Sequence, residues 1–198
     1  MPTFPPISTT PELARVTLQD TGECVFLFAN NERRSRQQMR QQVRQSLIEL
    51  IASAYALQKD EVHLVQELGT PPRLDANGIS HFVSFSHAAD LSCIAISRHR
   101  PLGLDLVHVD EIKGAQDCLD VAAIYLSPQV FQALPTVGPA DLPSRFIAVW
   151  AEHEAVLKCL GLPLQEWSQK LALATQGVES MSRWVDPSHV LAIAIRPV

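Results

Sequence analysis

Residues 146–162 (FIAVWAEHEAVLKCLGL) constrain the fold of this chain most strongly. Their apolar members recur at helical spacing, and Gly161 followed by Pro163 is a stop signal for a helix. At about 100° per residue, Glu154 and Lys158 fall on the apolar stripe of this helix, whereas Glu152 falls on the opposite side. The pattern predicts a long amphipathic helix with two charges on its inward face.

Two interpretations of Glu154 and Lys158 remain open at this point. They can form an ordinary ion pair four residues apart on a surface helix, worth a few tenths of a kcal/mol. Alternatively they line a polar cleft, because a carboxylate on an inward face needs a cation, a metal or hydrogen-bond donors to offset its desolvation.

The overall composition is that of a globular protein, with 198 residues and 46% hydrophobic content. The net charge of -5 gives no general attraction to nucleic acid or anionic membranes. No apolar run approaches the roughly 18 residues of a membrane helix, and residues 1–15 do not resemble a signal peptide. The four cysteines are scattered, so we expect neither structural zinc nor a disulfide framework. Together these features predict a cytoplasmic protein with no nucleic-acid or membrane partner.

The first half of the chain alternates short apolar runs with one long helix. The expected elements are an irregular lead-in (1–12), a strand (23–29), a helix (32–57), a strand (61–67), an exposed loop (69–78) and a hairpin (81–98). Arg36, Arg40 and Arg44 stack along one side of the helix, either as a solvated face or as a ridge that binds anions. Ser86 and His87 end the first hairpin strand, where a lone histidine is more often structural than catalytic.

The second half begins with residues 102–109, in which three leucines alternate with Asp105, Val107 and Val109. Asp105 either caps a turn or is a functional carboxylate within an apolar strand. The remaining expected elements are helices over 114–134 broken near 127–128, a loop (135–143), the long helix, a strand (170–175) and a hairpin (182–185 with 190–196).

The last strand, LAIAIR, repeats the pattern of SCIAISR at residues 92–98. Each half also begins with a strand and continues through a long helix. We therefore predict an α+β fold of two pseudo-symmetric halves, residues 1–100 and 101–198, each a small, mostly antiparallel sheet packed by a long helix. The active site is expected in the cleft between them.

Four stretches in this order resemble the surfactin-type 4′-phosphopantetheinyl transferases. They are LGTPPRL (68–74), VSFSHA (83–88), PLGLDL (101–106) and FIAVWAEHEAVLK (146–158). The resemblance implies Mg²⁺-dependent transfer of phosphopantetheine from coenzyme A to a serine of an apo carrier protein, with release of 3′,5′-ADP. The implied partners are coenzyme A and an acyl, peptidyl or polyketide carrier, and one chain holding both halves favours a monomer.

Site roles follow from the same resemblance, residue by residue. Asp105 and Glu154 would ligate Mg²⁺, Lys158 would contact the phosphates, and Ser86 with His87 would hold the nucleotide. Catalysis is assigned to Glu154, Lys158 and His153, with Glu154 or His153 taking the serine proton. The nucleotide phosphate would rest on three arginines, Arg44, Arg40 and Arg73.

Three positions depart from the family pattern. Val107 stands where a second acidic residue is common, His153 replaces a lysine, and Thr70 replaces the lysine that precedes a proline. A non-catalytic relative that binds coenzyme A or a carrier is therefore the nearest alternative. An unrelated Mg²⁺-dependent phosphohydrolase is a third, and it predicts product release without any protein acceptor.

Overall fold

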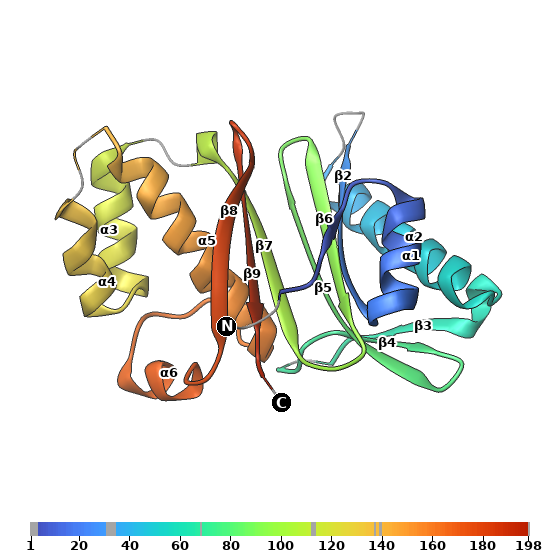
Figure 1. Cartoon of the computed structure of the whole chain (residues 1–198). Helices are drawn as coiled ribbons and strands as arrows, with labels where there is room; N and C mark the ends of the chain where they lie inside the picture. Colours follow the sequence, from blue (N-terminus) through green and yellow to red (C-terminus); the bar gives the residue numbers. More distant parts are fainter. Residues whose placement is uncertain are drawn as a thin grey trace.

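The computed structural model describes residues 4–30, 35–67, 69–111, 114–136, 138 and 140–197. They form an α+β fold with two sheets, whose strand orders are β1-β2-β6-β5-β4-β3 and β7-β9-β8. The sheets lie back to back, with helices on both outer sides (Figure 1). Every neighbouring pair of strands is antiparallel except β1 and β2.

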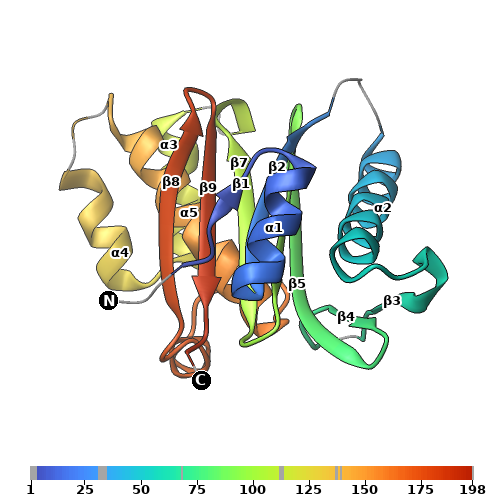
Figure 2. The same cartoon turned by 45° about the vertical axis from the view of Figure 1, so that its right-hand side comes forward.

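The six-stranded sheet uses strands from the first half of the chain. Its strands are β1 (Ile7–Ser8), β2 (Glu23–Ala29), β3 (Val62–Val65), β4 (Arg73–Ala76), β5 (Ile79–Ala88) and β6 (Leu91–Ser97). Helices α1 (Pro11–Thr21) and α2 (Arg36–Tyr55) cover its outer face. Figure 2 shows β5 bending at the end where it pairs with β4 rather than with β6.

The three-stranded sheet comprises β7 (Leu102–His108), β8 (Glu179–Asp186) and β9 (His189–Ile195). Helix α5 (Leu142–Leu160) packs on its outer face, and α3 (Ala115–Tyr125) with α4 (Pro128–Ala133) packs against α5. The short helix α6 (Gln169–Ala174) precedes β8. Each described helix is too short or too polar to cross a membrane.

Alternation along β7 determines what each of its faces contacts. The three leucines predicted to share a face pack between the two sheets, while Val107 packs against α5. Asp105 shares the face of Val107 and is therefore directed toward α5. The predicted alternation of residues 102–109 is thus confirmed, as is the hairpin of residues 81–98.

Gly103 allows β7 and α5 to approach closely. A Cβ atom at this position would lie 1.9 Å from the Ala155 carbonyl oxygen and 2.3 Å from the Cys159 nitrogen. Both atoms belong to the α5 backbone, which cannot rotate away as a side chain can. Only glycine fits here without moving the helix that carries Glu154 and Lys158.

We expect Gly103→Ala to lower the free energy of unfolding by about 3 kcal/mol or more, because the added methyl group overpacks two backbones. Gly138→Ala is the matched control, since its Cβ would meet only an Asp141 carboxylate oxygen at 3.7 Å. The control should change stability by less than about 0.5 kcal/mol. Urea denaturation of both variants measures the difference, and equal stabilities would contradict the close approach.

Four sequence predictions about elements are corrected. Residues 69–78 are not simply a loop, because Leu74 and Ala76 face the core within β4 and Asn77-Gly78 forms its hairpin turn with β5. Residues 170–175 fall in α6, not a strand, since the Ser168 hydroxyl caps that helix. The lead-in 1–12 contains β1 and the start of α1, and α5 begins inside the predicted loop 135–143.

Helix α2 starts later than predicted within the described residues. The Ser35 hydroxyl accepts a hydrogen bond from the Gln38 backbone, and the Gln38 side chain accepts one from the Ser35 backbone, which fixes the N-terminus at Arg36. Residues 31–34, which the prediction placed near the beginning of this helix, lie outside the described part of the chain.

Candidate active site

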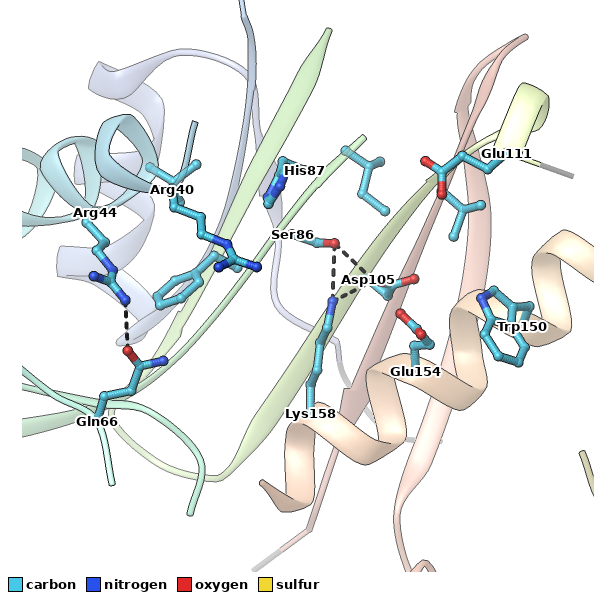
Figure 3. Close-up of a pocket in the computed structure, with 14 residues that line it drawn as sticks. Arg40, Arg44, Gln66, Ser86, His87, Asp105, Glu111, Trp150, Glu154 and Lys158 are labelled. Atoms are coloured by element: carbon cyan, nitrogen blue, oxygen red, sulfur yellow. Dashed lines mark hydrogen bonds and ion pairs between the residues drawn. The ribbon is translucent and has the colours of Figure 1, made fainter. Parts of the chain in front are cut away.

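A cavity of about 550 Å³ lies where β5 and β7 meet α2 and α5. Its walls bring together side chains from positions 40 to 158 of the chain (Figure 3). The lining residues are Arg40, Val43, Arg44, Gln66, Phe85, Ser86, His87, Asp105, Leu106, Val107, Glu111, Trp150, Glu154 and Lys158.

Asp105, Lys158 and Ser86 form a hydrogen-bonded cluster in this cavity. The Lys158 ammonium group donates to Asp105 Oδ1 at 2.5 Å and to the Ser86 hydroxyl at 3.2 Å. The Ser86 hydroxyl in turn donates to Asp105 Oδ1 at 2.9 Å. Asp105 is only 3% exposed, and Lys158 is its one ion-pair partner among the described residues. The ammonium group of Lys158 therefore offsets the cost of burying the Asp105 carboxylate.

The second oxygen of Asp105 is not satisfied. Asp105 Oδ2 is buried and accepts no hydrogen bond from the described residues. A buried carboxylate oxygen without a donor costs free energy, and a cation or a donor from a ligand would remove that cost. The neighbouring Glu154 carboxyl can donate to Asp105 only when it is protonated, so Asp105 Oδ2 is a candidate contact for a cation when Glu154 is ionised.

Glu154 lies beside Asp105 and has an unusual affinity for protons. Burial, and then the negative charge of Asp105, raise the pKa of Glu154 to about 7 despite the opposing charge of Lys158. Two carboxylates that share a partly buried space disfavour each other's ionised forms. A divalent cation bound between them would offset both the burial and the repulsion.

These carboxylates fit Mg²⁺, which prefers oxygen ligands from one or two carboxylates together with phosphates and water. Asp105 Oδ2 and Glu154 would hold it. Within the described ranges, no three His, Cys, Asp or Glu side chains are gathered closely enough to form a complete metal site. The remaining ligands would therefore come from a bound molecule and from water.

The opposite wall is cationic. Arg40 and Arg44 extend from α2 toward the cavity, and an Arg44 guanidinium nitrogen donates to the Gln66 side chain at 2.9 Å. His87 lines the same wall from β5. A second cavity of about 490 Å³ continues past Gln66, Phe85 and Lys158 to Thr70. An elongated anionic molecule would find positive charge at both the arginine wall and Lys158.

Local structure explains why these side chains meet. Glu154 and Lys158 are four residues apart on α5, so they project from one face of the helix as the sequence predicted. The Ser84 hydroxyl accepts a hydrogen bond from the Leu104 backbone at 3.0 Å, which ties β5 to β7. That tie sets Ser86, two residues further along β5, beside Asp105, the next residue of β7.

Arg73 and His153 are not brought to the cavity. The Arg73 guanidinium group lies over the Phe82 ring at 4.1 Å, away from the arginines of α2. His153 lines a separate cavity of about 300 Å³ on another side of α5, because neighbouring helical residues are about 100° apart. Burial lowers the pKa of His153 and so favours the neutral form of this histidine.

The sequence analysis did not identify Glu111, Gln66 or Phe85 as lining residues. Glu111 lies on the short 3-10 turn η2 (Val109–Glu111) that follows β7, where no periodic pattern indicates direction. Gln66 follows β3 in irregular structure and is uncharged, so neither periodicity nor charge indicated it as a site residue. Of these three residues, only Phe85 could have been identified from the sequence, because it lies in the VSFSHA motif next to Ser86 and His87.

Comparison of the chain with protein-family models and with curated proteins finds no match. The proposed function therefore rests on the geometry of the cavity.

Proposed function

We propose that this chain transfers the 4′-phosphopantetheine group of coenzyme A to a serine of an apo carrier protein, as a relative of the surfactin-type transferases. One observation carries the proposal: Ser86, Asp105, Glu154 and Lys158, from three of the motifs that resemble that family, line one cavity with Arg40 and Arg44. A cation site at one wall and guanidinium groups at another suit a pyrophosphate with a further phosphate at its nucleotide end.

The reaction forms one bond and breaks one. The carrier serine oxygen attacks the phosphorus bonded to the pantetheine arm, and the bond from that phosphorus to the bridging oxygen breaks. 3′,5′-ADP leaves with the bond's electron pair. The serine proton passes to a base, for which a carboxylate with a pKa near neutrality is suited.

Glu154 is the proposed base because it lines the cavity beside Asp105 and Lys158. Its pKa of about 7 belongs to the ligand-free chain, and a bound cation would lower it. His153, the other candidate from the sequence, lines a different cavity and is less well placed to accept the proton. Asp105 and Glu154 would hold Mg²⁺, which supplies charge neutralisation on the pyrophosphate when bound.

Lys158 changes partners in this proposal. In the ligand-free chain its ammonium group neutralises Asp105. With Asp105 holding a cation, Lys158 would donate to the leaving phosphate and stabilise the negative charge that develops on it. Arg40 and Arg44 would hold the nucleotide phosphate, and Ser86 and His87 would position the nucleotide.

We also infer a pseudo-symmetric arrangement of the fold. Two pseudo-symmetric halves, residues 1–100 and 101–198, would form the cleft that binds coenzyme A between them. A single chain would supply both walls, which favours a monomer, and the substrate favours a cytoplasmic location.

Release of 3′,5′-ADP separates this function from its two alternatives. The protein is incubated with coenzyme A and Mg²⁺, with and without a panel of apo carrier proteins, and nucleotides are resolved by anion-exchange chromatography. A transferase releases 3′,5′-ADP only when an apo carrier is present. A phosphohydrolase releases products without a carrier, and a binding protein releases none while calorimetry still detects coenzyme A binding.

A further inference from the structure

Strand β8 has an unpaired edge at one side of the three-stranded sheet. It is the outer strand in the order β7-β9-β8, so β9 is its one partner strand within the described part of the chain (Figure 2). The outer backbone groups of β8 can therefore hydrogen-bond to a strand from another chain. Met181 and Trp184 are 37% and 44% exposed on this strand, which adds apolar surface to the open edge.

Alternation along β8 places two opposite charges on one face. The serine hydroxyls at positions 180 and 182 donate to Glu152 of α5, so these positions are directed toward that helix. Glu179, Met181 and Arg183 therefore share the opposite face. Glu179 and Arg183 are exposed, and neither forms an ion pair with another described residue.

Symmetry restricts how β8 can pair with the same strand of a second copy. In an antiparallel pair related by a two-fold axis, a contact between two positions occurs twice, and residues opposite each other share a face of the sheet. When Met181 lies on the axis, Glu179 of each copy is opposite Arg183 of the other copy. Trp184 of each copy is then opposite Val178, so exposed apolar surface also meets.

Other registers lack this complementarity. Pairing centred on Glu179 would oppose two carboxylates, and pairing centred on Arg183 would oppose two guanidinium groups. Pairing centred on position 180 or 182 would place each charge opposite an uncharged residue. Charges on an edge strand usually prevent pairing, but here they are opposite in sign and equally distant from Met181. We propose that two copies of this chain associate through antiparallel pairing of their β8 strands, centred on Met181.

This dimer goes beyond the proposed function and does not depend on it. The described residues that line the cavity of Asp105 and Glu154 include none from β8, so each copy keeps a complete site. Because one chain holds a complete site, the monomer is a functional form and would predominate at low protein concentration.

Sedimentation equilibrium of the full chain over a range of concentrations tests the β8 contact. The wild type should show a reversible equilibrium between monomer and dimer. Arg183→Glu should raise the dimer Kd by about 10-fold or more, because two symmetry-related charge pairs change from attraction to repulsion. Glu179→Arg should have the same effect for the same reason.

An equimolar mixture of these two variants is the sharpest test, because every charge in a mixed dimer again faces its opposite. The mixture should associate about as tightly as the wild type, which would also show that both variants fold. Arg145→Glu makes the same change of charge at an exposed position of α5 and should leave the Kd within about twofold of the wild type. A wild type that stays monomeric, or a mixture that associates no better than each variant alone, would overturn the proposed contact.

Discussion

Glu154→Gln is expected to lower the rate of phosphopantetheine transfer by about 100- to 10,000-fold, the range that a positioned general base contributes. The substitution keeps the size of the side chain but removes the proton acceptor and one charge of the proposed cation site. Folding should survive, because burial and the charge of Asp105 already disfavour an ionised Glu154 in the ligand-free chain. Steady-state transfer to an apo carrier, together with a thermal melt, measures both effects.

Glu152→Gln provides a control on the same helix. Glu152 accepts hydrogen bonds from the Ser180 and Ser182 hydroxyls at 3.0 and 2.6 Å and lines the separate cavity of His153. Its loss should leave the transfer rate within about twofold of the wild type. A Glu154→Gln variant as active as this control would remove Glu154 from the mechanism.

Lys158→Met is expected to have the second large effect, lowering transfer by about 100- to 1,000-fold, as loss of a charge-stabilising donor does in other active sites. It should also lower the stability of the ligand-free protein, because Asp105 loses its ion-pair partner among the described residues. The loss should be smaller than the about 3–5 kcal/mol of a fully buried pair, since the Lys158 side chain is 34% exposed.

Mg²⁺ distinguishes the two roles of Lys158. Millimolar Mg²⁺ should raise the melting temperature of Lys158→Met more than that of the wild type, because the cation can neutralise the unpaired Asp105. Lys170→Met, on an exposed position of α6, should change neither activity nor the response to Mg²⁺. If Mg²⁺ stabilises both proteins equally, Lys158 and the cation do not compete for Asp105.

The central elements of the site could be predicted from the sequence because their side chains obey simple periodicities. Asp105 alternates with buried leucines, which fixes its face of β7, and Glu154 and Lys158 share one face of α5. Helix and strand periodicities predict the face of an element on which a side chain lies. They do not state which elements meet, so the contact between Ser86 and Asp105 required the structure.

Arg73 and Glu111 are two residues whose positions periodicity does not predict. Arg73 belongs to a strand, β4, that the sequence analysis took for a loop, and its guanidinium group stacks on Phe82. The Asn77-Gly78 dipeptide was a hairpin signal that could have indicated β4. Glu111 lies in a 3-10 turn, where direction depends on tertiary packing, and no pattern could have assigned it to the cavity.

Intact-protein mass spectrometry of apo carrier proteins tests the central claim most directly. Acyl, peptidyl and polyketide carriers are incubated with this protein, coenzyme A and Mg²⁺, beside parallel samples containing EDTA or the Glu154→Gln variant. We predict a mass gain of one phosphopantetheine group on at least one carrier, lost with EDTA and strongly reduced with the variant. No gain on any carrier, with coenzyme A binding still measurable, would contradict the transferase function and favour a binding protein.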